Sequence, residues 1–225
     1  MRSTTRTTTG AAFLAGPIVY LAGETIAAAA WKSPTYSYAT NWISDLGSAT
    51  SGVFQGRELS SPLHAVMNTG FIVQGLLFGV GAVLLSRSIT GRMRRTTVIM
   101  GVLITVGYLL VGLFHGSLQA QQNGTLWLHF LGATFAIFGG NLLALLLGRH
   151  WRKTPGTRRV GLVSLVLGTV GLVAAAVLLL TFDAGLPSGL IERVSVYTIV
   201  LFQISVAVAA LTSRSTTAGA RLARA

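Results

Sequence analysis

Six long apolar segments, joined by short connections, make up most of the sequence. They are Ala11–Trp31, Pro62–Ser86, Thr97–Leu118, Leu126–Gly148, Val160–Phe182 and Leu190–Thr212. A helix that crosses the roughly 30 Å hydrocarbon core of a bilayer needs about 20 residues, because each residue adds about 1.5 Å. Only 10% of the residues are charged, against about 25% in soluble domains, so the chain lacks the polar surface that water requires. The sequence predicts an all-α integral membrane bundle of six transmembrane helices.

The basic residues of the connections predict how this bundle is oriented. Lys32, Arg57 and Arg193 lie on one side, and the other 14 of the 17 Lys and Arg residues lie on the opposite side. Because connections rich in Lys and Arg stay in the cytoplasm, both termini are expected to be cytoplasmic. The predicted parts are a cytoplasmic N-terminal tail (1–10), a transmembrane domain (11–212) with an outer loop (32–61), and a basic cytoplasmic tail (213–225). Since the net charge of +12 is spread over membrane-flanking connections, it does not indicate nucleic-acid binding.

The first segment has an alternative interpretation. Arg2 and Arg6 precede an apolar stretch that ends in three alanines at positions 28–30, which is also the pattern of a secretory signal peptide cleaved after Ala30. Glu24 would fall just before the cleavage region, which argues against cleavage. The mass of the mature N-terminus distinguishes a retained helix from a removed signal.

The second and third segments resemble the fourth and fifth. At an offset of 65 residues, Leu63-His64 aligns with Leu128-His129, and Arg87, Gly91 and Arg94 align with Arg152, Gly156 and Arg159. At an offset of 68, Phe114-His115 aligns with Phe182-Asp183. The pattern predicts a parallel duplicated hairpin. The alternative is that any two hydrophobic hairpins with basic turns look alike.

The longest connection is the outer loop, roughly Lys32–Ser61, which is rich in Ser, Thr, Gly and aromatic residues. A loop of this length is usually functional or disordered. Trp31, Tyr36, Tyr38 and Trp42 have the amphipathic rings that are favoured at the level of lipid headgroups. We therefore expect a short interfacial helix or a re-entrant fold in this loop.

Ionisable and amide side chains gather in the outer loop and at the outer ends of the predicted spans. The candidate outer polar site comprises Glu24, Asn41, Ser44, Asp45, His64, Asn68, His115, His129, Asp183 and Glu192. Ionisable groups within spans usually face the bundle interior, so side chains from different helices at one level can form a single site. The alternative for residues at span ends is simple contact with water and headgroups. Gln74, Asn141 and Gln203 lie deeper and are expected to form interhelical hydrogen bonds.

Glu24 is the deepest acidic residue of this set. It lies seven residues before Trp31, about 10 Å below the outer end of its helix. An unpaired carboxylate at this depth would be protonated, because the loss of water disfavours the charged form. A hydrogen bond across helices is the alternative. For Glu192, the adjacent Arg193 offers an ion-pair partner.

Histidine and carboxylate side chains suit Zn²⁺, and His64, His129, Asp45 and Asp183 are the possible ligands. The sequence has no HExxH motif, so the fold would have to assemble such a zinc site. Ser44, Asp45 and His64 offer a nucleophilic alternative without the usual GxSxG elbow. The chain has no cysteine, which excludes disulfides and thiolate sites.

Five stretches together resemble the domain-of-unknown-function family 998. They are TNWISDLGS at 40–48, HAVMNTGF at 64–71, VGLFHG at 111–116, LHFLGA at 128–133 and GLIERV at 189–194. The resemblance runs from about residue 13 to 212, and the SDLG and LHFLGA segments are its most specific parts. It implies a six-helix bundle in a prokaryotic plasma membrane, with an outward-facing motif set around Asn41, Ser44, Asp45, Asn68, His129 and Glu192. A proline is common in the family where this sequence has His115, so the resemblance does not imply a family-wide ligand there. It implies no reaction.

Three functions compete at this stage. The preferred one is a non-catalytic or accessory bundle with a polar pocket on the extracytoplasmic side, which associates with itself or with a membrane partner protein. The second is a metal-assisted hydrolase or binder that acts on a lipid or amphiphile at the outer leaflet. The third is a proton-coupled transporter that uses Glu24, and the scarcity of ionisable groups in the inner halves of the spans counts against it. Membrane lipids are expected to contact the protein in every case.

Overall fold

The computed structural model describes residues 3–181 and 186–212 of the 225-residue chain. Within these ranges, six helices are long and apolar enough to cross a membrane. They are α1 (Ser3–Ala30), α2 (His64–Ser86), α3 (Gly91–Leu113), α5 (Leu126–Trp151), α6 (Arg158–Leu180) and α7 (Ser188–Thr212). This finding confirms the all-α architecture of six spans. The predicted basic tail, 213–225, lies outside the described residues.

The first span begins at Ser3 rather than Ala11, and the third span differs from its prediction at both ends. Helix α3 begins at Gly91 rather than Thr97 and ends at Leu113 rather than Leu118. Its first five residues contain three arginines, which hydropathy excludes from a span although arginine is a good helix former. The residue after Leu113 adopts an extended backbone, and the chain then makes the separate short helix α4 (Leu118–Gln122).

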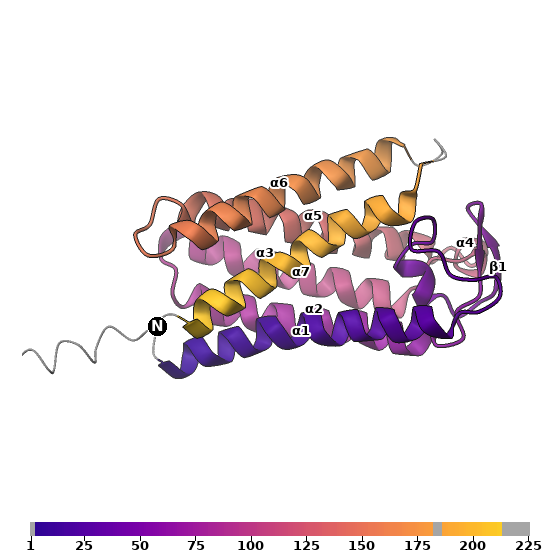
Figure 1. Cartoon of the computed structure of the whole chain (residues 1–225), viewed down its shortest axis with the longest axis horizontal. Coiled ribbons are helices and arrows are strands. Elements are labelled where there is room, and N and C mark those ends of the chain that lie inside the picture. Colours follow the sequence, from indigo (N-terminus) through magenta and orange to yellow (C-terminus); the bar gives the residue numbers. More distant parts are fainter. Residues whose placement is uncertain (1–2, 182–185, 213–225) are drawn as a thin grey trace, which may run out of the picture.

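The six long helices form a ring in the order of the chain. Each helix packs against the next one, and α7 closes the ring by packing against α1 (Figure 1). The start of α1 lies beside the end of α7, where Arg6 Nε donates to the carbonyl of Ala210 at 3.4 Å. The α2–α3 and α5–α6 turns, with their arginines, lie at this same end. We call it the basic end, and we call the opposite end, which carries residues 31–63, the loop end.

Glycines let neighbouring helices approach closely. A Cβ atom on Gly75 of α2 would lie 2.6 Å from Cβ of Tyr108 on α3. A Cβ on Gly107 of α3 would lie 2.5 Å from the backbone nitrogen of Ala136 on α5. Direct backbone packing of this kind is what small residues at helix interfaces provide in membranes. Both predicted hairpins are present, and their common origin by duplication remains a prediction.

The deeper amides form interhelical hydrogen bonds, as predicted. Gln74 Nε2 of α2 donates to Gln203 Oε1 of α7. Asn141 of α5 donates through Nδ2 to the carbonyl of Ser195 at 2.8 Å and accepts from the Thr198 hydroxyl at 2.8 Å. These bonds connect α7 to helices on both sides of the ring.

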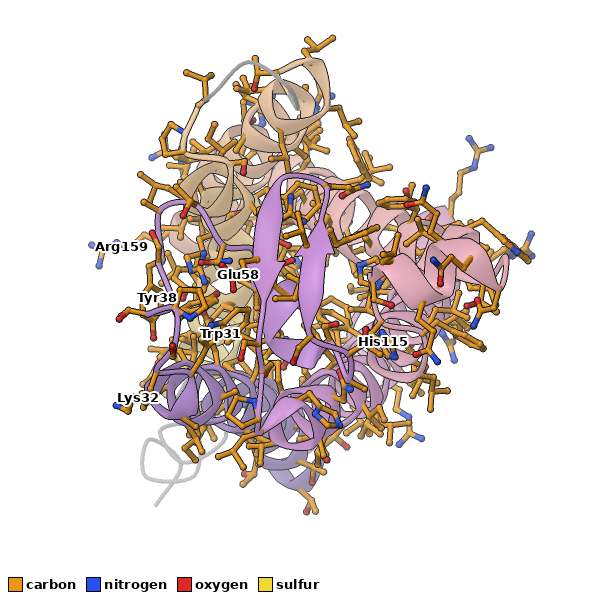
Figure 2. All side chains as sticks on the ribbon, turned by 90° about the vertical axis from the view of Figure 1, so that its right-hand side faces the viewer. Trp31, Lys32, Tyr38, Glu58, His115 and Arg159 are labelled. Carbon is orange, nitrogen blue, oxygen red and sulfur yellow. The ribbon has the colours of Figure 1, made fainter. Side chains whose placement is uncertain are left out.

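Residues 31–63, which we call the cap loop, fold over the loop end. They contain a 3₁₀ helix, η1 (Ser44–Gly47), and an antiparallel hairpin of β1 (Gly52–Phe54) and β2 (Arg57–Leu59). The hairpin turn places Gln55 at φ 48° and Gly56 at φ 73°, since tight two-residue hairpin turns require positive φ. Figure 2 views this end of the bundle with the hairpin in front. The expected short helix is therefore present as one turn, whereas the strands were not predicted.

The aromatic residues of the cap loop mostly face the protein. Trp31, Tyr36 and Trp42 are buried, and only Tyr38 is exposed, at 47%. The rings of Trp31 and Tyr36 pack with their centroids 5.2 Å apart. The prediction that these rings contact headgroups is therefore wrong for three of the four. The physical reason is that these rings pack over Arg193 and Arg57, two charged side chains that no sequence pattern placed beneath the loop.

Candidate functional site

A buried ion pair joins the first and last helices near the loop end. Glu24 of α1 and Arg193 of α7 are 2% and 4% exposed, and Arg193 Nε donates to Glu24 Oε1 at 3.1 Å. The Tyr197 hydroxyl donates to the other carboxylate oxygen at 2.9 Å. Glu24 is therefore not unpaired: it is bonded across helices, which was the alternative given for it. Arg193 does not pair with Glu192, because adjacent helical residues point about 100° apart.

Arg193 also holds the cap loop. Its Nη1 donates to the carbonyls of Tyr38 and Asn41, at 2.8 Å each, and its Nη2 donates to the Tyr36 hydroxyl. The Tyr36 hydroxyl in turn donates to the carbonyl of Trp42 at 2.9 Å. Burial raises the pKa of Tyr36 well above its ordinary value, so the hydroxyl keeps the proton that it donates. One guanidinium thus fixes three points of the loop.

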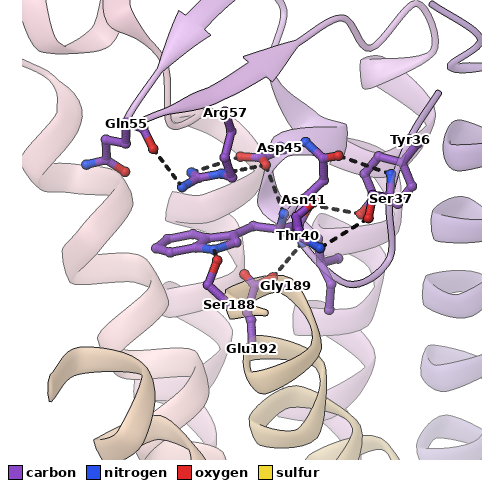
Figure 3. A network of polar contacts seen from close by, with 12 residues as sticks. Tyr36, Ser37, Thr40, Asn41, Asp45, Gln55, Arg57, Ser188, Gly189 and Glu192 are labelled. Carbon is purple, nitrogen blue, oxygen red and sulfur yellow. Dashed lines mark hydrogen bonds and ion pairs between the residues drawn. The ribbon is translucent and has the colours of Figure 1, made fainter. Parts of the chain in front are cut away.

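A second ion pair fastens the β-hairpin to η1. Asp45 is 2% exposed and accepts from Arg57 through both carboxylate oxygens, at 2.9 Å from Nε and 3.2 Å from Nη2 (Figure 3). It also accepts from the backbone nitrogen of Trp42 at 2.8 Å. The guanidinium of Arg57 lies 4.2 Å from the centre of the Trp42 ring. Asp45, which we considered as a metal ligand, is therefore occupied by Arg57 and by the backbone of Trp42.

Helix α7 binds the cap loop at two further points. Glu192 Oε2 accepts from the backbone nitrogen of Ile43 at 2.5 Å. The Ser188 hydroxyl accepts from Trp42 Nε1 at 2.9 Å. Figure 3 shows Ser188 and Glu192 at the start of α7, beneath the cap loop. The cap loop is thereby fixed to α7 as well as to α1 and α2, the helices that it connects.

A cavity of about 230 Å³ lies next to the cap loop. Its wall includes an apolar or aromatic side chain from each long helix: Tyr20, Phe71, Val111, Ala133, Ala175 and Val196. Phe130 and Leu179 also line it and are 40% and 66% exposed, so the cavity reaches the surface of the bundle along α5 and α6. The pocket that we expected to be polar is therefore mainly apolar.

Three residues of the candidate set, Ser44, His129 and Glu192, line this cavity. His129 is 3% exposed, and its Nδ1 lies 2.7 Å from the carbonyl of Phe114. Because a carbonyl only accepts, Nδ1 carries the proton, and Nε2 of the neutral ring has a lone pair. Within residues 3–181 and 186–212, neither His129 Nε2 nor Glu192 Oε1 has a hydrogen bond. The cavity therefore has an end that is rich in acceptors.

Other candidate residues brace the cap loop away from the cavity. Asn68 Nδ2 on α2 donates to the carbonyl of Gly47 at 3.0 Å. Asn41 accepts a backbone hydrogen bond from within the loop at 3.1 Å. His64 Nδ1 lies 3.2 Å from the carbonyl oxygen of Ser61. In the structure these three side chains thus contact the cap loop.

His115 lines a second cavity, of about 260 Å³, between the end of α3 and α4. Burial lowers the pKa of His115, and the nearby His64 lowers it further. Within the described part of the chain, no three His, Asp or Glu side chains come together as metal ligands. His64, His129 and Asp45 are thus not assembled into the zinc site that we considered, and Asp183 lies outside the described residues.

Sequence reasoning missed the central role of Arg193. The available signal was that it is the one basic residue inside the last predicted span, close to its outer end, as Glu24 is in the first. Arg57 and the aromatic partners Tyr36 and Tyr197 were missed as well. Nothing in their local sequence indicates contacts with residues so far along the chain.

Comparison with known proteins gives one match. A family model described as "Protein of unknown function (DUF998)" matches residues 13–209. No curated protein and no solved structure matches the chain.

Proposed function

Because this chain belongs to the DUF998 family of proteins of unknown function, we propose its function from its own geometry: a non-catalytic membrane protein that binds an amphiphile in the cavity beside the cap loop. The observation that carries the proposal is the cavity itself, with its apolar wall and its polar end at Ser44, His129 and Glu192. Apolar walls with a few convergent polar groups are the usual form of small-molecule sites.

The position of the opening supports a lipid-like occupant. Phe130 and Leu179, the exposed parts of the wall, belong to helices that are long enough to cross a membrane. Leu179 lies one residue before the end of α6, so the opening is near the boundary between acyl chains and headgroups. An amphiphile reaches such an opening from within the bilayer.

The size of the cavity indicates how the occupant lies. About 230 Å³ is below the range of roughly 300–1,000 Å³ for drug-sized ligands. The cavity therefore holds the head and the first carbons of an amphiphile, while the rest of the tail extends into the bilayer along α5 and α6.

The geometry favours binding over the two active alternatives. Glu24, the residue required by a proton-coupled transporter, is held by Arg193 and Tyr197. Within the described residues no metal-ligand cluster is present to support hydrolysis. Neither alternative has a specific observation in its favour.

Native mass spectrometry of the purified protein in mild detergent tests the proposal. We expect the wild-type protein to retain one lipid-sized adduct. Ala175→Phe fills the cavity from α6, and we expect the adduct to fall at least about tenfold, which corresponds to about 1.4 kcal/mol of binding free energy. The neighbouring Ala176 is exposed, so Ala176→Phe adds the same ring to the lipid-facing surface and should retain the adduct.

A second cavity variant guards against misfolding of the first. Ala133→Phe fills the cavity from α5, where Ala133 is only half-buried. Two results would overturn the proposal: a wild-type protein that carries no adduct, or cavity variants that both retain as much adduct as the wild type.

A further inference from the structure

The basic end of the bundle, opposite the cavity, exposes a set of cations. Its two turns and the helix ends beside them carry nine Lys and Arg side chains, all exposed: Arg87, Arg92, Arg94, Arg95, Arg149, Arg152, Lys153, Arg158 and Arg159. Over residues 3–181 and 186–212, both ion pairs lie at the loop end, and none of these nine side chains donates a hydrogen bond to the protein. The positive charge of the basic end is thus available to a partner outside the bundle.

These cations do not stabilise the helices on which they lie. Three arginines fall within the first five residues of α3, and two arginines begin α6. The start of a helix carries a partial positive charge, which disfavours cations and favours anions. Neither helix has an acidic residue in its first turn to offset this charge. An anion from outside the chain would offset both the arginines and the helix starts.

Two of the arginines lie on the lipid-facing sides of their helices. Arg95 of α3 is one helical turn from Ile99, which is 51% exposed, and Arg159 of α6 is one turn from Val163, which is 46% exposed. Residues four apart share a face of the helix and lie about 6 Å apart along its axis. Since both helices are long and apolar enough to cross a membrane, Ile99 and Val163 face acyl chains. The two guanidinium groups therefore lie where acyl chains give way to phosphates.

The kind of cation indicates the kind of anion. Lys and Arg orient a membrane protein equally well, yet eight of the nine exposed cations are Arg. The planar guanidinium of Arg binds a phosphate through two parallel hydrogen bonds, which the ammonium of Lys cannot do.

We propose that Arg95 and Arg159 bind the head groups of anionic phospholipids in the leaflet at the basic end. A zwitterionic lipid brings its own ammonium group and leaves the surplus positive charge uncompensated, so anionic lipids bind more tightly. Nucleic acid also offers phosphates, but the position of both arginines next to residues that face acyl chains favours lipid.

Native mass spectrometry of the full-length protein in mild detergent tests this proposal. The protein is titrated with phosphatidylglycerol or phosphatidylcholine that have the same acyl chains. We expect phosphatidylglycerol to bind at least about tenfold more tightly, because each basic residue beside an anionic head group is worth about fivefold in affinity. The same preference in Ala175→Phe separates these lipids from an occupant of the cavity. Equal binding of the two lipids by the wild type would overturn the proposal.

Two double variants locate the binding. Arg95→Gln/Arg159→Gln should remove most of the preference for phosphatidylglycerol. Arg152→Gln/Lys153→Gln removes the same charge from the turn that follows the end of α5 and should keep it. All four side chains are exposed, so both variants should unfold at the wild-type temperature in detergent without added lipid.

Two further results would contradict the assignment. Equal losses of affinity in the two double variants would replace the two arginines with a diffuse attraction by the whole basic end. Displacement of phosphatidylglycerol by a short RNA at the same phosphate concentration would replace lipid with nucleic acid as the partner. Neither result bears on the cavity at the other end.

Discussion

The pair of Glu24 and Arg193 is the residue-level feature on which the loop end depends most. Burying two charges costs more than their attraction returns unless further hydrogen bonds satisfy them. Here Tyr197 completes the carboxylate, and the Tyr36 hydroxyl and loop carbonyls complete the guanidinium. The pair therefore specifies which two helices meet and how the cap loop lies over them.

Removal of one partner should be far more harmful than removal of both. Arg193→Met leaves the Glu24 carboxylate buried without a counter-charge, which costs about 3–5 kcal/mol. We expect a large fall in the thermal unfolding temperature in detergent, and partial recovery in the double variant Glu24→Gln/Arg193→Met.

Arg94→Met provides the control, because Arg94 is exposed at the basic end and its loss should change the unfolding temperature little. The role assigned to the pair would be contradicted if the double variant lowered the unfolding temperature by the sum of the two single changes.

At the level of elements, the cap loop and the first turn of α7 act as one unit. Gly189 faces the carbonyl of Asn41 so closely that any Cβ atom would overlap it. The Glu192, Ser188 and Arg193 bonds to the loop all depend on this approach. Glycine at this position is therefore needed for contact rather than for an unusual backbone angle.

Gly189→Ala should loosen the cap loop. The added methyl overpacks the contact, at a cost of about 1–3 kcal/mol, so the loop should leave α7 while the helical bundle persists. Limited trypsin digestion measures this as faster cleavage after Lys32 and Arg57. The control is Leu190→Ala, at a lipid-facing position of the same turn that is 52% exposed, and it should be digested at the wild-type rate. If Gly189→Ala is also digested at the wild-type rate, the proposed attachment of the loop to α7 is refuted.

The sequence was sufficient for the spans and insufficient for the cap loop. Hydropathy locates helices because length and apolar composition are local properties, and all six predicted helices are present, although α1 and α3 begin earlier than predicted. The partners of the loop are set by ring closure between α1 and α7, which no local pattern encodes: Glu24 and Arg193 lie 169 positions apart. For the same reason the cavity, with a wall drawn from every long helix, could not be predicted.

At the scale of the whole molecule, the distribution of charge at the two ends accounts for an asymmetry in the sequence. All five acidic residues of the sequence, Glu24, Asp45, Glu58, Asp183 and Glu192, fall in the predicted outer connections or in the span ends next to them, although acids have little influence on topology. Two of them, Glu24 and Asp45, neutralise Arg193 and Arg57 at the loop end. The arginines of the α2–α3 and α5–α6 turns at the basic end are exposed, and those acids do not neutralise them.

This difference predicts that the loop end is extracytoplasmic. Since the chain has no cysteine, single cysteines report the side directly. A membrane-impermeant maleimide should label Ser51→Cys in intact cells and Thr154→Cys only after lysis, as both residues are exposed and lie at opposite ends. The reverse pattern would invert the topology.

The closure of the ring between α1 and α7 also has a consequence for biogenesis. Ribosomes deliver Glu24 to the translocon with the first helix, whereas Arg193 arrives with the last, so the nascent carboxylate waits without its counter-ion through the insertion of four intervening spans. A carboxylate at that depth stays neutral by holding a proton. The arrival of the arginine therefore supplies the missing counter-charge, and only then can the cap loop, which the same arginine holds, close over the bundle.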